Sequence, residues 1–279
     1  MTNLVWLQGS HPDIYHLWQA GFGDEASCID RFFRHLPQVH TLAALQDGAH
    51  VSMAIAMDGL TLHRPGLPAL PLVYAYCVTT LPEHRGCGHS RAIMRALAEQ
   101  TQQAGALLCW RPATPSLADW YARILPVQAG FPAVTRTVQA AAASDSLQAL
   151  PAAPADYAEA RHTLLCNRAH VSFSPALLAL QEEAGRESGG GLFLLQDGQT
   201  AGCAVTECGS DGTLFIKELL CPGIPTGAAV QSLLQTHNMP RAVLRMPPDG
   251  CPAAENMVQT ASVQPVDGIE QAWFGLFFD

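Results

Sequence analysis

The sequence is poor in charge and almost without lysine. Only 14% of its 279 residues are charged, and Lys217 is its one lysine, so Schiff-base chemistry at any other position is excluded. The formal net charge is −9, which disfavours a nucleic-acid partner. Hydrophobic residues make up 48% of the chain, which is typical of a globular protein with well-buried cores.

The motifs of several site classes are also missing. The nine cysteines are scattered singly with no C-x-x-C pair, which is typical of reduced, buried thiols in a cytosol. The eleven histidines show no H-E-x-x-H spacing, so we expect no metal site. No G-x-S-x-G occurs, and a serine hydrolase would lack its nucleophile elbow.

Long apolar runs are missing too. No stretch approaches the ~18 apolar residues of a membrane span. The first thirteen residues lack a basic region followed by a long apolar core, as a secretory leader would have. From these absences we expect a soluble, cytoplasmic protein that has no membrane partner.

What the chain does contain is an unbroken strand, glycine turn and helix at residues 73–98. Residues 73–81 are dense in β-branched and aromatic residues, and a proline ends the run. Gly86 and Gly88 follow, and apolar residues then recur at helical spacing. Because a helix N-terminus presents N–H groups and partial positive charge, this turn is predicted to cradle a phosphate. An ordinary strand-to-helix turn is the alternative.

The run Arg85-Gly86-Cys87-Gly88-His89-Ser90 resembles the Q/R-x-x-G-x-G/A motif of the Gcn5-related N-acetyltransferase (GNAT) superfamily, which holds the pyrophosphate of acetyl-coenzyme A. Ser90 stands where the motif has its last Gly or Ala. The dinucleotide fingerprint fails at its third glycine and the P-loop lysine is missing. The resemblance implies that the following residues contact acetyl-coenzyme A: Cys77, Val78, Thr79, Arg85, Gly86, Cys87, Gly88, His89 and Ser90.

The predicted elements ahead of the motif also resemble the GNAT fold. A strand at residues 4–7 precedes a helix that begins at Pro12 and a second helix that Asp24 can cap. Two strands then flank Asp47-Gly48, a hairpin signal. The run LWQAGFGDEASCIDRFF is similar to the amino-terminal helices of a bacterial branch of the superfamily that has two tandem lobes.

The second half repeats this order in degraded form. A hairpin at Asp197-Gly198 is followed by a strand at residues 213–220, but the phosphate turn is replaced by residues 221–227, which include two prolines. We therefore predict an α/β fold of the α+β type with mixed sheets, as two tandem GNAT-like lobes of which the second is degenerate. The predicted domains are an acetyl-coenzyme A-binding lobe at 1–143, an Ala/Pro-rich connector at 144–155 and the degenerate lobe at 156–279.

Two residues are candidates for catalysis. Tyr121 lies in a segment that resembles S-L-x-x-F-Y-x-x-x-G-F, in which the family's tyrosine protonates the departing thiolate; half-buried packing is the alternative. Residues 125–129 depart from that pattern. In related two-lobed enzymes of the enhanced-intracellular-survival type the C-terminal carboxylate enters the active site, which makes Asp279 the second candidate. The general base stays open among Glu83, Tyr74, Tyr76 and a water chain.

The resemblance implies an N-acetyltransferase that moves an acetyl group from acetyl-coenzyme A, its cosubstrate, to a primary amine by direct attack. The acceptor would be a small-molecule or peptide amine. The alternative is a catalytically lapsed acyl-coenzyme A sensor or partner-binding module. The identity of the amine and the oligomeric state are left open. Residues 60–71, rich in proline and glycine, are expected to form a loop that covers the site.

Overall fold

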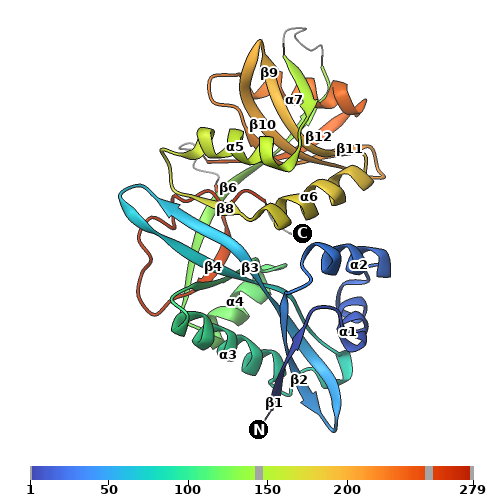
Figure 1. Ribbon diagram of the computed structural model, residues 1–279, viewed down its shortest axis with the longest axis vertical. Helices are drawn as coiled ribbons and strands as arrows, with labels where there is room; N and C mark the ends of the chain where they lie inside the picture. Colours follow the sequence, from blue (N-terminus) through green and yellow to red (C-terminus); the bar gives the residue numbers. More distant parts are fainter. Residues whose placement is uncertain (1, 142–146, 249–253, 277–279) are drawn as a thin grey trace. The chain divides into compact units, whose positions relative to one another are not determined.

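The computed structural model describes residues 2–141, 147–248 and 254–276 (Figure 1). Its first half contains β1 (Asn3–Gln8), α1 (Pro12–Phe22), α2 (Ala26–His35), β2 (His40–Gln46), β3 (Ala49–Arg64), β4 (Leu67–Thr80), the 3-10 turn η1 (Pro82–His84), α3 (His89–Gln103), β5 (Leu107–Trp110), α4 (Pro115–Ile124) and β6 (Val127–Gln139). Its second half contains β7 (Gln148–Pro151), α5 (Pro154–Leu165), β8 (His170–Phe173), α6 (Pro175–Glu187), β9 (Gly191–Asp197), β10 (Gln199–Cys208), β11 (Thr213–Leu220), α7 (Thr226–His237), β12 (Arg241–Met246) and β13 (Glu255–Ala261).

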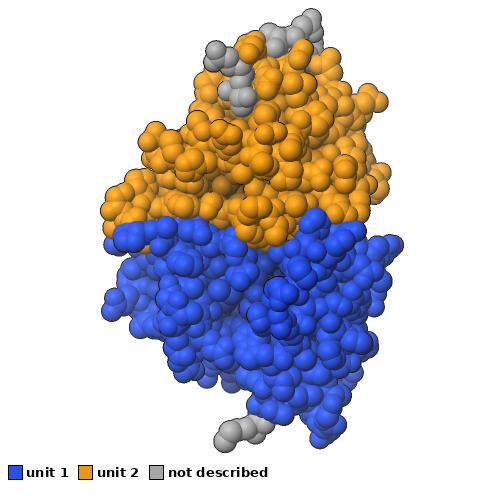
Figure 2. Space-filling view, in the orientation of Figure 1, with its two compact units in different colours: residues 1–62, 68–130, 258–267 blue, residues 63–67, 131–257, 268–279 orange. Residues whose placement is uncertain are grey.

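The chain forms two compact units (Figure 2). Unit 1 comprises 1–62, 68–130 and 258–267, and unit 2 comprises 63–67, 131–257 and 268–279. The chain passes from unit 1 to unit 2 within β6, and β13 begins in unit 2 and ends in unit 1. The continuous lobes predicted from the sequence stay a prediction, but their connector is not structureless, since it contains β7 and the start of α5.

Unit 1 is built on a mixed sheet with strand order β1-β2-β3-β4-β5-β13. β4 and β5 are parallel, and α3 connects them. The predicted apolar face of α3 is confirmed, because Ile93, Met94 and Leu97 are buried against Ala75 of β4 and Leu108 of β5. Successive strand residues face opposite sides of a sheet. The neighbouring Tyr76 accordingly contacts Trp18 of α1 and Phe32 of α2 rather than α3.

Unit 2 repeats this plan with strand order β6-β12-β11-β10-β9-β7. Its parallel pair is β11 and β12, connected by α7, just as α3 connects β4 and β5. Val230 and Leu233 of α7 pack against Leu214 and Ile216 of β11. Helices α5 and α6 contribute to a second cluster that includes Val205 of β10. The predicted fold class is therefore confirmed, including the second GNAT-like layer arrangement.

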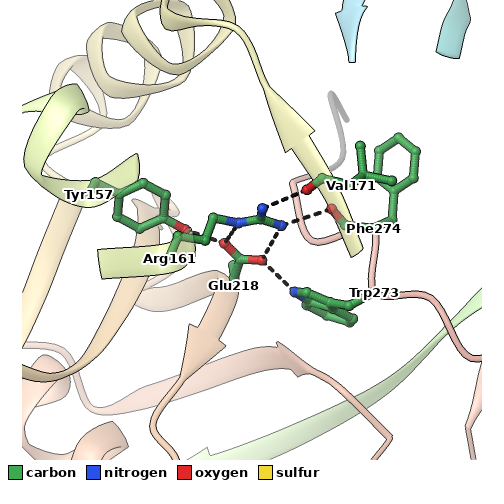
Figure 3. A network of polar contacts seen from close by, with 6 residues as sticks. All are labelled: Tyr157, Arg161, Val171, Glu218, Trp273 and Phe274. Atoms are coloured by element: carbon green, nitrogen blue, oxygen red, sulfur yellow. Dashed lines mark hydrogen bonds and ion pairs between the residues drawn. The ribbon is translucent and has the colours of Figure 1, made fainter. Parts of the chain in front are cut away.

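A buried ion pair joins α5 to β11 in unit 2 (Figure 3). The Arg161 side chain of α5 donates from Nε to Glu218 Oε2 at 2.8 Å and from Nη2 to Glu218 Oε1 at 3.1 Å. The Tyr157 hydroxyl and the Trp273 indole N–H also donate to this carboxylate. Arg161 in turn donates to the carbonyl oxygens of Val171 and Phe274. Each guanidinium nitrogen and each carboxylate oxygen of the pair thus makes at least one hydrogen bond, as buried charges require.

Three histidines gather near this network in unit 2. The rings of His63 and His170 stack with centroids 5.1 Å apart, and the His162 ring lies 6.4 Å from that of His170. The His63 Nε2 atom is 2.8 Å from the Ser172 hydroxyl. Burial lowers the pKa of His170 to about 4, although a hydrogen bond to the Arg168 carbonyl opposes the shift. Burial also lowers the pKa of His63.

These histidines predict a loss of stability in mild acid. The pKa of His170 is about 4 in the folded chain and near 6.5 when unfolded, so between pH 6.5 and pH 4 the unfolded state takes up a proton that the folded state does not. The free energy of unfolding should therefore fall as the pH falls through this range, which urea denaturation can measure. His170→Gln should flatten the decline, whereas His16→Gln, at an exposed residue of α1, should not. Equal declines in both variants would contradict the assignment to His170.

The segment at 60–71 corrects one expectation. It forms no loop over a site, because β3 continues to Arg64, β4 begins at Leu67, and only Pro65 and Gly66 make the turn, with Gly66 at φ 76°. The sequence interpretation gave the prolines and glycine more weight than the alternation that buries Leu60 and Leu62.

Two further expectations differ from the structure. Asp24 does not cap α2, whose N-cap is Glu25 without a side-chain hydrogen bond. The apolar C-terminal segment is buried as predicted, since Trp273, Phe274 and Leu276 are at most 1% exposed, but its described residues form only a single bridge to His170 instead of a strand. Asp279 lies outside the described residues.

Candidate functional site

The strands β4 and β5 separate after a short parallel pairing. The described residues pair Leu72–Tyr74 with Leu107–Cys109, and β5 ends one residue later, whereas β4 continues to Thr80. Cys77 has φ 49°, a left-handed conformation that is rare for a residue with a side chain. Cys77 therefore interrupts the regular strand geometry within the part of β4 that extends beyond its pairing with β5. Residues 77–79, predicted to align a thioester, are therefore on a strand without a neighbour from β5.

The glycine turn that follows β4 is open at the start of α3. Gly86 and Gly88 have φ values of 80° and 86°, and Gly88 is the N-cap of α3. Within the described residues no side chain caps this helix, and a Cβ at either glycine would meet no atom within 4 Å. The first N–H groups of α3 are thus not used by a side-chain cap, which leaves them available to an anion.

Ser90 has a structural use that the family's Gly or Ala would not allow. Its hydroxyl lies 2.5 Å from the Thr80 hydroxyl, which is in turn 2.8 Å from the Ser52 hydroxyl. The Ser52 hydroxyl also donates to the Thr79 carbonyl at 2.7 Å. This cluster ties the start of α3 to the end of β4. The Ser90 hydroxyl therefore points toward Thr80 and Ser52, away from the solvent-facing side of the glycine turn.

The His89 side chain is hydrogen-bonded to Gln46, the last residue of β2. Its Nε2 is 3.0 Å from the Gln46 amide oxygen, and His84 Nδ1 is 3.2 Å from the same oxygen. Because an amide oxygen can only accept, His89 Nε2 and His84 Nδ1 each donate a hydrogen bond to it. His89 is only 7% exposed, and its Nδ1 has no hydrogen-bond partner among the described residues. The motif therefore contains one buried polar atom that a ligand or a water could satisfy.

The remaining motif residues have different surroundings. Arg85 Nε donates to the Thr80 carbonyl at 3.3 Å, which anchors an otherwise exposed side chain beside the turn. Cys87 is exposed, with its thiol 3.8 Å from the Arg85 carbonyl. Thr79 packs so closely against Gly21 of α1 that a Cβ there would lie 2.4 Å from the Thr79 hydroxyl. The glycine lets α1 approach β4 at the site.

Tyr121 lies beside the point where β4 leaves β5. It belongs to α4, whose first turn is capped by the Thr114 hydroxyl. Tyr121 is 7% exposed and shares an apolar cluster with Ala75, the residue after the last paired position of β4. Its ring centroid is 5.0 Å from that of Trp110. Burial raises the pKa of Tyr121 to about 12, so the phenol holds its proton throughout the physiological range and can only donate it.

Asp24 is an additional candidate for the site, which the sequence interpretation did not consider. Its Oδ2 accepts the Trp18 indole N–H at 2.7 Å, and the Trp18 and Phe32 rings each lie 5.5 Å from that of Tyr76. Burial is the main cause that raises the pKa of Cys77, and the negative charge of Asp24 adds to it. The charge of Asp24 therefore reaches Cys77, the left-handed residue of β4. In the sequence, Asp24 stands between Gly23 and the apolar, aromatic face of the next helix, where the pattern predicts a helix cap.

The comparisons with known proteins agree with this geometry. A family model described as Acetyltransferase (GNAT) domain matches residues 8–124. Residues 8–124 form a GNAT domain. The matched range runs from the end of β1 to the end of α4, so this GNAT domain includes the glycine turn, Tyr121 and Asp24. Lys217 and Asp279 lie outside it.

Solved structures resemble the chain along almost its whole length. A conserved protein of unknown function from Enterococcus faecalis V583, described as a probable N-acyltransferase, has a TM-score of 0.70 at 16% identity, with 93% of this chain and 72% of that chain covered. A Gcn5-related N-acetyltransferase from Kribbella flavida has a TM-score of 0.65 at 17% identity and coverages of 93% and 70%. A tandem GNAT protein from the clavulanic acid biosynthesis pathway has a TM-score of 0.55 at 13% identity and coverages of 95% and 100%.

No curated protein matches the sequence. None of the helices in the described ranges has the length and apolar character needed to cross a bilayer. At these identities the structural likeness shows the fold, and the family match shows the GNAT domain.

Proposed function

We propose that the GNAT domain transfers an acetyl group from acetyl-coenzyme A to a primary amine. The observation that carries this proposal is the open, uncapped start of α3 at Gly86 and Gly88, directly beyond the end of a strand that has left its parallel neighbour. An anion can approach the N–H groups there without displacing any side chain.

The residues present fit the donor. The N–H groups of residues 85–90 would hold the pyrophosphate, and the main chain of residues 77–79 would align the pantetheine arm. The Nδ1 of His89 has no partner among the described residues, and because Nε2 donates to Gln46, Nδ1 of the neutral ring accepts, so it would contact a water or an N–H of the ligand and not the pyrophosphate itself. When bound, acetyl-coenzyme A supplies an acetyl group that is activated as a thioester.

Tyr121 serves the leaving sulfur. Burial raises the pKa of Tyr121 to about 12, whereas a free thiol has a pKa of about 8.5, so complete transfer of the phenolic proton to the thiolate is uphill. Tyr121 therefore acts chiefly by donating a hydrogen bond that stabilises the negative charge on the departing sulfur, and a proton carried through it must be replaced from the acceptor ammonium or from solvent.

Asp24 serves the acceptor side. Because the Trp18 indole occupies Oδ2, the Oδ1 atom is left to attract an ammonium group and then to take its proton. We therefore add Asp24 to the candidates for the general base, which are Glu83, Tyr74, Tyr76 and a water chain. Among them, Tyr74 is buried and Glu83 is exposed.

Tyr121→Phe tests the acid role. With saturating substrates the rate of coenzyme A thiol release should fall roughly a hundredfold, in the range that a positioned general acid contributes. The affinity for acetyl-coenzyme A should be unchanged. The assay needs an acceptor, so a panel of small amines, aminoglycosides and peptide N-termini comes first. Trp120→Phe, beside Tyr121 but without a hydroxyl to lose, is the matched control and should stay near the original rate.

Other outcomes of this assay discriminate between functions. An unchanged rate in Tyr121→Phe would remove the acid role while leaving acetyl transfer in place. Tight binding of acetyl-coenzyme A with no thiol release from any amine of the panel would instead favour an acyl-coenzyme A sensor or a partner-binding module.

A further inference from the structure

We propose that Gln259 is a positioning residue for the Tyr121 phenol, and this proposal rests on the proposed function, in which that phenol serves the departing sulfur. Gln259 belongs to β13, which lies far beyond the family match at residues 8–124. The part of β13 that pairs with β5 nevertheless belongs to unit 1. A strand from the C-terminal part of the chain thus completes the sheet beside the candidate acid.

The Gln259 amide joins β5 to α4. Gln259 is opposite Trp110 in the antiparallel pair of β13 and β5, so the two side chains lie on the same face of the sheet. Its Oε1 accepts the indole N–H of Trp110 at 3.0 Å, and its Nε2 donates to the carbonyl of Ala118 in α4 at 3.2 Å. Because an indole N–H only donates and a carbonyl only accepts, the two contacts need a side chain that does both, as an amide does.

Trp110 and Ala118 are also neighbours of Tyr121. The centroids of the Trp110 and Tyr121 rings are 5.0 Å apart, and Ala118 lies one turn before Tyr121 in α4. Burial is the only cause that raises the pKa of Tyr121, and no hydrogen bond from the described residues contributes. The phenol is therefore held by packing, so its position depends on how firmly the Trp110 indole and the first turn of α4 are held.

The same C-terminal segment also holds the chain where it leaves α4. Residues 125–129, which depart from the family's pattern, contact this segment at two points. The Ser262 N–H donates to the Pro126 carbonyl at 3.0 Å. The Gln128 side chain donates from Nε2 to the Val266 carbonyl at 3.3 Å and accepts the Val266 N–H at 2.8 Å. The helix is thus tied to the segment near both of its ends.

Gln259→Leu tests the proposal, because leucine is similar in size and makes neither hydrogen bond. The rate of coenzyme A thiol release with saturating substrates should fall roughly tenfold, since a small displacement of a catalytic group is costly. The affinity for acetyl-coenzyme A, measured by calorimetry, should be unchanged, and thermal unfolding establishes that the variant is folded. Gln264→Leu, at an exposed glutamine of the same segment, is the matched control and should keep the original rate.

A double variant separates positioning from general stability. If Gln259 acts through the phenol, adding Gln259→Leu to Tyr121→Phe should change the remaining rate by less than about twofold, because no hydroxyl is left to misplace. A merely structural role would slow both backgrounds by the same factor. Equal losses in the two backgrounds, or the original rate in a folded Gln259→Leu chain, would overturn the proposal.

Nuclear magnetic resonance tests the link without turnover. With ¹³C-labelled tyrosine rings, Gln259→Leu should shift the Tyr121 signal, which is identified by its loss in Tyr121→Phe, and should leave that of Tyr157 in unit 2 in place. Gln259→Glu keeps the acceptor for Trp110 but loses the donor for Ala118, so this milder variant should shift the same signal less. An unmoved Tyr121 signal in both variants would contradict positioning. A moved signal in a chain that releases no thiol would support positioning and count only against acetyl transfer.

Discussion

Gly88→Val is expected to lower the affinity for acetyl-coenzyme A by roughly a hundredfold, because it would cost about two charge-assisted hydrogen bonds. Gly88 sits at φ 86°, a conformation that a β-branched residue resists, and its missing Cβ faces open space. Valine would both fill the approach to the first N–H groups of α3 and pull the turn out of shape. Calorimetric titration with acetyl-coenzyme A measures the loss.

The chain provides a closely matched control. Gly223 has the same φ of 86° and likewise no atom within 4 Å of an added Cβ, but it lies in the degenerate turn of unit 2. Gly223→Val should therefore carry a similar conformational cost in thermal unfolding and keep its affinity for acetyl-coenzyme A. Equal losses of affinity in the two variants would mean that the glycine turn of the GNAT domain is not the binding site.

Glu218→Gln is expected to destabilise the chain by about 3–5 kcal/mol, the usual cost of breaking a buried ion pair on one side. Glu218 is 0% exposed and receives hydrogen bonds from Tyr157, Arg161 and Trp273 (Figure 3). The amide would leave the guanidinium of Arg161 charged and buried without its counterion. It would also place a donor among donors. The free energy of unfolding from urea titration gives the size of the effect.

An exposed pair in the same unit serves as the comparison. Arg241 Nη2 lies 2.6 Å from Asp211 Oδ2, but the two side chains are 44% and 57% exposed. Asp211→Asn should change the stability little, because solvent screens such pairs. The double variant Arg161→Met, Glu218→Leu should recover part of the loss. If Glu218→Gln lost no more than Asp211→Asn, the network would have no special energetic weight.

Local chemistry explains which parts of the fold the sequence predicted. The glycine turn, the preceding strand and the apolar face of α3 are specified within 26 consecutive residues, 73–98. The strand at 213–220 was predicted with its observed bounds for the same reason. The Asp47-Gly48 hairpin also formed, with both residues at positive φ as this turn requires.

The parts that the sequence did not predict depend on distant partners. Arg161 is a polar residue in the middle of α5, and its burial makes sense only with Glu218, 57 positions later in the chain. Gln259 appears in the sequence as an ordinary polar strand residue, because its two hydrogen-bond partners stand 149 and 141 positions earlier in the chain. Asp24 is likewise explained by Trp18 and Cys77, not by the helix that follows it.

The path of the chain between the units limits how the protein can be divided. β13 pairs with β5 in unit 1 through residues that come more than a hundred positions later, and β6 pairs with β12 in unit 2. A fragment of residues 1–143 would therefore expose the edge of β5, and a fragment of residues 156–279 would expose edges on both sides of its sheet, where β6 and β7 belong. Such unpaired edges promote aggregation. We therefore expect a fragment that contains the GNAT domain but lacks β13 to aggregate more readily than the full chain.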